Sequence, residues 1–139
     1  MIFNALVPEL DVSDYERSLD FYTNVLGFDL EYDRSNPSFA LLSYGMAQLM
    51  IQQQETGWSA SGQLEYPYGR GINLQIAANN LRELVERLKK QQYPIRRDIE
   101  ETWRKAGNQL VGEIEIHLLD PDGYFLRFSE VIGRRELIT

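Results

Sequence analysis

One hydrophobic pattern occurs twice in the chain, at an offset of 66 positions, and this repeat constrains the fold more than any other feature of the sequence. In the first copy, apolar residues alternate over residues 3–12 as in a half-buried strand and then recur at helical spacing over residues 19–26. The second copy follows the same plan with different side chains. The matching positions are Leu6 with Ile72, Pro8 with Leu74, Leu10 with Ile76, Ser13 with Asn79, Tyr15 with Leu81, Leu19 with Val85, and Tyr22 with Leu88. Such a repeat predicts two copies of one structural module.

Each copy continues into three further strand-like runs. In the first copy, Ser13 and Glu16 form a capping box at the start of the expected helix, and Gly27 stands where that helix should end. In the second copy, the helix carries an apolar stripe and is followed by a break at Tyr93-Pro94. The stripe consists of Leu81, Leu84, Val85 and Leu88. The expected strands are 28–33, 38–44 and 46–53 in the first copy, and 95–103, 112–119 and 124–130 in the second. We therefore expect an α+β fold of two tandem βαβββ modules.

The chain is long enough for one domain with a sizeable core, and we expect that domain to span residues 1–139. Its expected parts are module one at about 1–54, a connecting loop at about 55–69, module two at about 70–132, and a short C-terminal tail. The loop is expected because residues 52–70 lose all periodicity and are rich in Gln, Gly and Ser. Loops longer than ~12–15 residues inside a compact domain are often functional.

The last two expected strands have two faces of different chemistry and are joined by a tight turn, Asp120-Pro121-Asp122-Gly123. One face is apolar and consists of Ile114, Ile116, Leu118, Leu126 and Phe128. The other consists of Glu113, Glu115, His117, Phe125, Arg127 and Ser129. The same parity adds Val7 and Glu9 in module one, and Asn73 and Gln75 in module two. Since helices are the natural cover for an apolar face, we expect curved mixed sheets around a cleft, with the helices on the outside.

The charge balance and the rarity of two residue types exclude several classes of protein. With 21 acidic and 14 basic residues the formal charge is −7, which disfavours nucleic acid as a partner and favours a cationic small molecule. The sequence has no cysteine, which excludes a disulfide scaffold and a Cys nucleophile, and His117 is its one histidine. No apolar run is long enough for a membrane span and the N-terminus lacks the features of a signal peptide, so we expect a cytoplasmic protein with no membrane partner.

Three segments resemble the vicinal oxygen chelate superfamily, which includes glyoxalase I, extradiol dioxygenases, and fosfomycin and bleomycin resistance proteins. The segments are VSDYERSLDFYTNVLGF, GRGINLQIAANNLRELVERL and HLLDPDGYFLRFSE, and with the repeat the resemblance covers nearly the whole chain. It implies the tandem βαβββ fold and, in the family's enzymes, a divalent metal held in the cleft by side chains from both modules. Carried over to this chain, the ligand positions are Val7, Asn73, Arg127 and a site near Met50.

The side chains at these four positions are poorly suited to the usual metal, which needs several imidazole or carboxylate donors. Val7 has no donor, and Met50 offers only a soft thioether. Asn73 offers a neutral amide, and Arg127 brings a permanent positive charge to the place of the cation. We therefore expect a protein with no bound metal and no cofactor.

Arg127 and Glu115 lie on neighbouring expected strands with the same facing, so they can form an internal ion pair at the former metal position. Alternatively, Arg127 receives the carboxylate or phosphate of a ligand, and both interpretations hold if the ligand competes for the pair. His117 lies on the same face, where we expect it to contact a ligand. If the protein is an enzyme, His117 and Glu115 are the candidate catalytic residues. Glu9 and Gln75 hold equivalent strand positions in the two modules and are further candidate contacts.

Two tryptophans are candidates for stacking on a planar or cationic ligand. Trp58 lies in the connecting loop and Trp103 lies near the end of an expected strand, and ordinary packing is the alternative for both. The full set of candidate ligand-binding residues is Glu9, Met50, Trp58, Asn73, Gln75, Trp103, Glu115, His117 and Arg127.

Two hypotheses for function follow. The leading one is a metal-free binding protein that resembles bleomycin resistance proteins and sequesters a small molecule, such as a cationic glycopeptide drug, in the cleft. The alternative is a metalloenzyme of the glyoxalase, lyase or dioxygenase type with a displaced metal site at Glu9, Glu115 and His117. The resemblance also implies that each module closes a cleft with the other module or with a second chain, so we expect a homodimer, either side by side or with exchanged modules.

Overall fold

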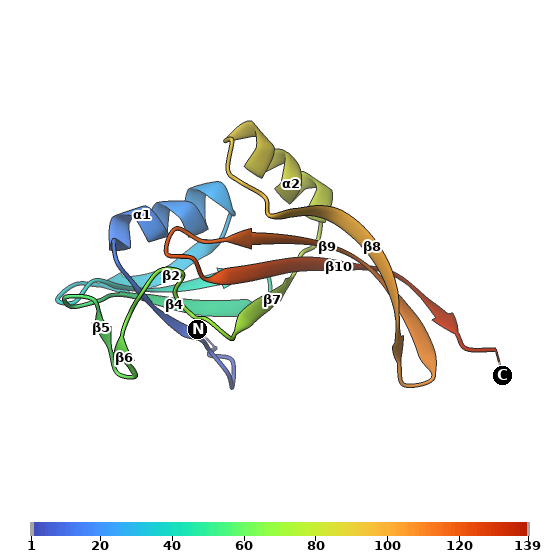
Figure 1. Ribbon diagram of the computed structural model, residues 1–139, viewed down its shortest axis with the longest axis horizontal. Coiled ribbons are helices and arrows are strands. Elements are labelled where there is room, and N and C mark those ends of the chain that lie inside the picture. The colour runs from blue at the N-terminus through green and yellow to red at the C-terminus, as the bar shows by residue number, and fades with distance from the viewer. Residues whose placement is uncertain (1, 139) are drawn as a thin grey trace. The chain divides into compact units, whose positions relative to one another are not determined.

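The computed structural model describes residues 2–138, and this part of the chain divides into two compact units (Figure 1). The first unit comprises residues 2–72 and 120–124, and the second comprises residues 73–119 and 125–138. Each unit contains one four-stranded sheet, which confirms the predicted α+β class and the tandem βαβββ plan. Among the helices of residues 2–138, none is both long and apolar enough to cross a membrane.

The first unit follows the predicted order of strand, helix and three strands. Its sheet has the order β1-β4-β3-β2, in which β1 runs parallel to β4 and the other pairs are antiparallel. Two further short strands, β5 and β6, pair within the segment that we expected to be a loop. The elements are β1 (Glu9–Val12), α1 (Tyr15–Asp20), η1 (Phe21–Val25), β2 (Asp29–Arg34), β3 (Phe39–Tyr44), β4 (Ala47–Gln53), β5 (Trp58–Ser59) and β6 (Gly62–Gln63).

The first strand is shorter than the alternation of residues 3–12 predicted, because β1 begins only at Glu9. Before that point the Pro8 carbonyl still accepts from the Met50 backbone N–H at 2.8 Å, and Asn4 is held by side-chain hydrogen bonds. The Asn4 backbone N–H donates to Oε1 of Gln48 at 2.7 Å, and Nδ2 of Asn4 donates to the Met46 carbonyl at 2.7 Å. Leu6, which belongs to the apolar alternation of residues 3–12, is 81% exposed. The prediction failed because apolar alternation does not reveal side chains that compete with backbone pairing.

The helix of the first unit begins one residue later than the predicted capping box. Asp14 is the N-cap, and its side chain accepts a hydrogen bond from the Arg17 backbone N–H at 3.1 Å. Helix α1 continues as a single π-helical turn, η1, and the chain then leaves the helix at Gly27, whose φ of 92° is the left-handed conformation predicted there. The helix and the sheet enclose a core that includes Tyr22, Leu26, Leu42 and Ile51, all buried.

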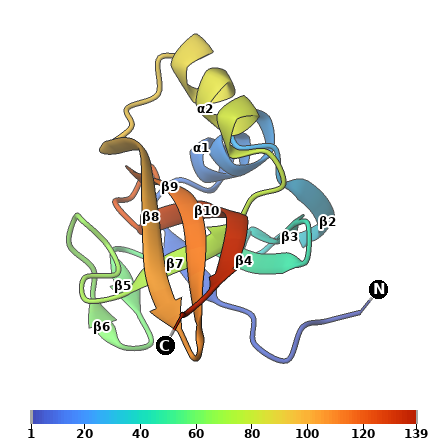
Figure 2. The ribbon, with the colours of Figure 1, turned by 90° about the vertical axis from the view of Figure 1, so that its right-hand side faces the viewer.

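The second unit repeats this topology with longer strands (Figure 2). Its elements are β7 (Asn73–Ala77), α2 (Leu81–Lys90), β8 (Arg97–Ala106), β9 (Gln109–Leu119) and β10 (Phe125–Glu136). The sheet order is β7-β10-β9-β8, with β7 parallel to β10 and the other pairs antiparallel. Strand β10 continues to Glu136, through most of the segment that we expected to be a C-terminal tail.

Helix α2 and one face of its sheet bury the predicted apolar residues. Asn80 caps the helix by accepting from the Glu83 backbone N–H at 3.2 Å. The Leu81 backbone N–H donates to Oε1 of Glu130 on β10 at 2.8 Å. All four residues of the predicted helical stripe are buried, and so are the apolar side chains of the facing strands. The latter are Ile76, Ile114, Ile116, Leu118, Leu126 and Phe128.

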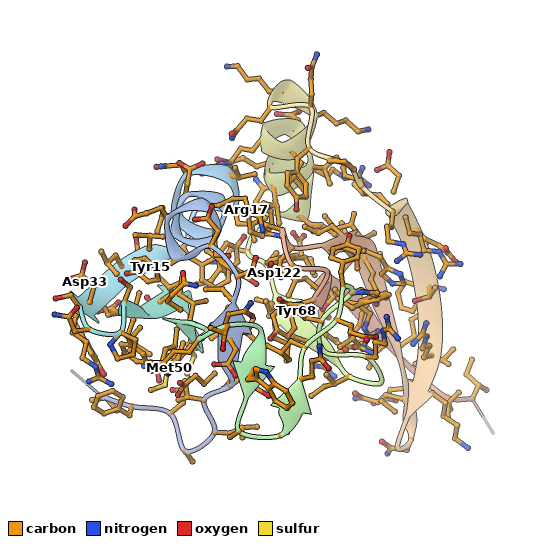
Figure 3. The ribbon with its side chains drawn as sticks, turned by 60° about the vertical axis from the view of Figure 1, so that its left-hand side comes forward. Tyr15, Arg17, Asp33, Met50, Tyr68 and Asp122 are labelled. Atoms are coloured by element: carbon orange, nitrogen blue, oxygen red, sulfur yellow. The ribbon has the colours of Figure 1, made fainter. Side chains whose placement is uncertain are left out.

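The turn between β9 and β10 belongs to the first unit, although both strands belong to the second. The Gly123 backbone N–H donates to the Asp120 carbonyl at 2.9 Å, and Gly123 has a φ of 91°. Asp122 accepts from the Ser13 backbone N–H at 2.9 Å and from Nη2 of Arg17 at 3.2 Å, and it also pairs with the Ser13 hydroxyl. Figure 3 shows Arg17 and Asp122 side by side. Ser13 is therefore unavailable for the predicted capping role because this long-range partner occupies it.

Candidate functional site

The polar face of the second sheet carries a connected set of side chains centred on Arg127. Strand β10 lies between β7 and β9, and Arg127 pairs across the ladder with Gln75 on one side and His117 on the other. Side chains at directly opposed positions point to the same face, so these three side chains lie together. Asn73 and Glu115 complete the set, which we call the Arg127 site.

Three neighbours hold the guanidinium group of Arg127. Its Nε donates to Oδ1 of Asn73 at 2.9 Å, and its Nη2 donates to Oε1 of Gln75 at 2.8 Å. Its Nη1 donates to Oε1 of Glu115 at 3.2 Å, so the internal ion pair predicted from the sequence is present. The Arg127 side chain is 23% exposed, while Asn73 and Gln75 lie at the exposed edge of the sheet. The guanidinium is thus oriented by protein groups and still reaches solvent.

Glu115 connects Arg127 to His117. Oε1 of Glu115 also contacts Nε2 of His117 at 2.5 Å, and the Glu115 side chain is only 10% exposed. Burial by itself would raise the pKa of the Glu115 carboxyl, but the hydrogen bond from His117 and the charge and hydrogen bond of Arg127 outweigh it and lower the pKa. Glu115 is therefore ionised at neutral pH and can only accept hydrogen bonds there.

Phe125 borders the Arg127 site, and we did not single it out as a candidate from the sequence. Its ring lies 5.2 Å from the His117 ring, centre to centre, and the side chain is half-buried. The signal was present in the alternation of β10, which places Phe125 on the same face as Arg127. The site therefore combines an apolar surface with charged and polar groups.

Three of the other candidate residues lie in the first unit. Glu9 is exposed on β1 and pairs across the ladder with Met50 on β4. Met50, which is labelled in Figure 3, is half-buried. Trp58, on β5, is 58% exposed. Its backbone N–H donates to the Glu55 carbonyl at 3.0 Å, and the role of its side chain in stacking stays a prediction.

Trp103 lies in the second unit, on β8, and packs within its own sheet. A Cβ atom added at Gly112 would lie 2.5 Å from the indole, and one added at Gly133 would lie 3.2 Å from it. The guanidinium of Arg135 lies over the indole at 3.8 Å from the ring centre. These contacts match the packing alternative for Trp103, and its contact with a ligand stays a prediction.

The residues at the family's metal positions do not form a metal site. Val7 lies outside the strands and has no donor atom, and Met50 offers one thioether. At Asn73 the amide oxygen already accepts from Arg127, whose positive charge opposes a cation. Residues 2–138 contain no group of three or more His, Cys, Asp and Glu side chains arranged to hold a metal ion. Of the displaced site considered above, Glu115 and His117 are in contact in the second unit, and Glu9 lies in the first.

Comparison with known proteins identifies a family. The profile of the Glyoxalase/Bleomycin resistance protein/Dioxygenase superfamily matches residues 5–128. The lactoylglutathione lyase of Salmonella typhimurium is 29% identical over 127 residues, which are 87% of this chain and 87% of that protein. The enzyme of the same name from Escherichia coli O157:H7 is 28% identical over the same shares of the two chains.

Solved structures agree in fold. A superfamily protein from Alicyclobacillus acidocaldarius superposes with a TM-score of 0.66 at 16% identity, over 94% of this chain and 92% of that one. A fosfomycin resistance protein from Listeria monocytogenes superposes with a TM-score of 0.57 at 19% identity, over 92% and 91% of the two chains. With the profile match over most of its length, the chain belongs to the Glyoxalase/Bleomycin resistance protein/Dioxygenase superfamily.

Proposed function

We propose that this protein binds a small organic molecule at the Arg127 site without a metal ion, as a binding protein that resembles the bleomycin resistance proteins of its superfamily. The observation that carries the proposal is the guanidinium of Arg127, which stands at a position where the family's enzymes have a metal ligand and is held there by Asn73, Gln75 and Glu115. A site whose central group is already oriented loses little conformational entropy when a ligand binds.

Electrostatics supports the absence of a metal from this function. Two unit charges ~4 Å apart interact with about 4 kcal/mol at an effective dielectric constant near 20, so a divalent cation beside Arg127 would be opposed by about twice that amount. The partial neutralisation of Arg127 by Glu115 reduces this repulsion, but it also removes the carboxylate as a free ligand. The Arg127 site therefore favours hydrogen-bonding ligands over a metal.

A cationic glycopeptide drug is the first ligand to test, since the chain carries a formal charge of −7. Purified protein is dialysed and its content of nickel, zinc, iron and manganese is measured, and it is then titrated with bleomycin while tryptophan fluorescence is followed. We expect no stoichiometric metal and a saturable change in fluorescence. Stoichiometric metal in the dialysed protein would overturn the proposal. A metal-free protein that does not respond to bleomycin would exclude this drug as the ligand.

A second candidate function is a lyase, and the similarity to lactoylglutathione lyases over 87% of both chains is the observation that favours it. Within the second unit, Glu115 and His117 are the donors available to hold its metal. The test is lactoylglutathione lyase activity with and without added Ni²⁺ or Zn²⁺, in the natural protein and in Glu115→Gln. Activity that depends on the metal and is lost in Glu115→Gln would establish the lyase and displace the binding function.

The proposed assembly is a homodimer, as expected for a βαβββ sheet that closes a cleft with a second chain. Light scattering coupled to size-exclusion chromatography measures the mass in solution, and the chain of 16.2 kDa would give about twice that value. A monomeric mass at micromolar protein would contradict the dimer and leave the Arg127 site as a property of the single chain.

A further inference from the structure

Strand β8 is the outer strand of the second sheet and has a free edge. Within residues 2–138 only β9 pairs with it, at the end of the sheet order β7-β10-β9-β8 (Figure 1). The ladder with β9 is regular from Glu100 to Ala106, because the shift in register lies before Glu100. Most side chains of this stretch are exposed. A free strand edge of this length is a template for pairing with another strand.

The turn between β8 and β9 determines which residues present their backbone groups to the free edge. It is a two-residue turn that begins at Gly107, whose φ of 63° is the left-handed conformation that such hairpin turns need. The residues that flank it, Ala106 and Gln109, form the hydrogen-bonded pair that closes the hairpin, and bonded and non-bonded pairs alternate from there along β8. The residues whose N–H and C=O groups point away from β9 are therefore Glu101, Trp103 and Lys105.

The largest side chain of β8 leaves this edge uncovered. The Trp103 indole lies against Gly112 on β9 and Gly133 on β10, where added Cβ atoms would be 2.5 Å and 3.2 Å from it. The guanidinium of Arg135, also on β10, lies 3.8 Å from the centre of the indole ring. The ring is thus folded over the sheet, and another strand can approach the backbone of β8 without displacing it.

The charges along β8 change sign at Trp103, the centre of the regular stretch. Glu101 precedes it by two residues and Lys105 follows it by two, so both side chains lie on the face of the sheet that carries the indole. Neither makes an ion pair within residues 2–138. An antiparallel copy of β8 centred on Trp103 would place each Glu101 opposite a Lys105, whereas a parallel copy would place like charges together. Charges that only blocked the edge would not need this order.

We infer that β8 binds a second copy of this chain by antiparallel strand pairing about a two-fold axis at Trp103. Glu101 of each copy lies opposite Lys105 of the other, and Thr102 lies opposite Arg104. All the backbone N–H and C=O groups that point away from β9 in the regular stretch then have partners, and the two second sheets become one continuous sheet. The contact goes beyond the proposed function, because it uses no residue of the Arg127 site.

Charge reversal tests this pairing by sedimentation equilibrium. The contact is small, so we expect a dissociation constant of tens of micromolar, and the mean mass should rise toward twice its value between micromolar and submillimolar protein. Glu101→Lys and Lys105→Glu should each raise the dissociation constant roughly tenfold or more, because like charges are then opposed in both pairs.

An equimolar mixture of these two variants should recover the rise in mass. At the two positions one chain then carries only basic side chains and the other only acidic ones, so both pairs are attractive again. Glu136→Lys is the matched control, because it makes the same change of charge at an exposed position on β10, away from the free edge. It should leave the dissociation constant unchanged within about twofold.

Disulfide formation tests the register, since the natural chain has no cysteine. Thr102 of one copy and Arg104 of the other would form a non-hydrogen-bonded pair, whose Cα atoms are about 4.5 Å apart and within reach of a disulfide. Under oxidising conditions, a mixture of Thr102→Cys and Arg104→Cys should therefore give a covalent dimer. Each variant alone should give much less, because its cysteines would be diagonal neighbours about 7–8 Å apart.

The inference is overturned if the mass of the natural protein does not rise with concentration, if either charge reversal leaves the rise intact, or if their mixture fails to restore it. Efficient cross-linking of Thr102→Cys alone would place the axis at Thr102 and reject the pairing centred on Trp103. The cross-link does not depend on the charge variants, so it decides the matter even if one of them does not fold. Bleomycin titration, metal content and the mass at micromolar protein report separately on the proposed function.

Discussion

The two sheets have the same ladder register but different chemistry at matching positions. In the first unit, Glu9 pairs with Met50, and Met50 pairs with Leu41. In the second unit the equivalent row is Gln75, Arg127 and His117. Leu41 is fully buried, whereas the row of the second unit forms a hydrogen-bonded polar network. On the two central strands, the βαβββ plan therefore tolerates either the apolar pair Met50 and Leu41 or the polar pair Arg127 and His117. The candidate function follows from these side chains rather than from the topology.

The two units also differ in charge. The first has twelve acidic and three basic residues, a formal charge of −9, and the second has nine acidic and eleven basic residues, a formal charge of +2. Two of the carboxyls in the first unit, Asp120 and Asp122, are buried and serve the turn between β9 and β10. Some of the carboxyls counted in the net charge of −7 thus have structural roles. The net charge is therefore weaker support for a cationic ligand.

We expect the largest change in the free energy of unfolding from the turn of the β9–β10 hairpin, which differs from the turn of the β3–β4 hairpin. The β9–β10 turn is buried at Asp122, whereas Met46 in the β3–β4 turn is 92% exposed. Asp122→Ala should lower the free energy of unfolding by about 3 to 4 kcal/mol, because Ser13 and Arg17 lose their acceptor and Ser13 is left with unpaired groups. Met46→Ala, measured by the same urea titration, should change it by less than about 0.5 kcal/mol. Equal effects would show that the β9–β10 turn is not anchored.

Asp120 should make the free energy of unfolding depend on pH, with a change of about 3 kcal/mol. Burial raises the pKa of the Asp120 carboxyl from 3.8 to about 6, against hydrogen bonds from Tyr22 and from the backbone N–H groups of Tyr124 and Asp122 that lower it. The folded state then binds the proton more tightly than the unfolded state. The free energy of unfolding should fall as the pH rises from about 4 to about 6, by about 3 kcal/mol from this group. Asp120→Asn should remove this part of the pH dependence in urea titrations.

Glu115 in the second unit provides the opposite sign. Its pKa is lowered, so its contribution to stability is present above the unfolded pKa and is lost as the pH falls through the folded value. In the natural protein, Glu115 makes the free energy of unfolding fall toward acid pH, and Asp120 makes it rise. Glu115→Gln should therefore abolish the fall, and Asp120→Asn should abolish the rise. If both substitutions changed the pH profile in the same direction, the assignment of burial to one carboxyl and ion pairing to the other would be wrong.

An intermediate effect is expected when Arg127 is replaced by the residue that holds its place in the first sheet. Arg127→Met leaves Glu115 with little exposure and without its guanidinium partner, and should cost about 2 kcal/mol at pH 7 and less at acid pH, once Glu115 is protonated. Arg127→Met combined with Glu115→Leu should recover most of this loss, since both ends of the pair are then apolar. Met50→Leu is the matched control and should cost less than about 1.5 kcal/mol. No recovery in the double variant would contradict an ion pair as the source.

Elements with a strong period were predictable from the sequence. The stripe of α2 and the alternation on β9 and β10 depend on neighbouring residues only, and both apolar faces are buried as predicted. The same alternation placed Arg127, Glu115 and His117 on one face, and the structure confirms their contact. Local patterns are sufficient there because each side chain's facing is set by the backbone period.

Features that depend on distant partners could not be predicted. Ser13 is taken from its capping role by Asp122, which lies 109 residues further along the chain. The early part of β1 is lost to side-chain hydrogen bonds with Gln48, and no hydropathy pattern encodes such competition. Similarly, parity placed Asn73 and Gln75 on the polar face, but only their distances to Arg127 show that they orient it.

The smallest effect concerns the part of the second sheet that extends beyond the length of the first sheet. Strands β8, β9 and β10 contain 10, 11 and 12 residues, whereas β2, β3 and β4 contain 6, 6 and 7. Gly112→Ala would place a Cβ 2.5 Å from the Trp103 indole, so the ring must move and lose part of its stacking with Arg135. We expect a loss of about 1 kcal/mol in the free energy of unfolding, near the lower limit for overpacking because the half-buried ring can tilt toward solvent.

In a Trp58→Phe background, the remaining tryptophan emission should shift to longer wavelength as the indole becomes more exposed. Gly133→Ala, with its Cβ at 3.2 Å, is the graded control and should do less. An unchanged emission in Gly112→Ala would mean that the indole does not pack on Gly112. Packing of Trp103 would then not be what stabilises the long strands.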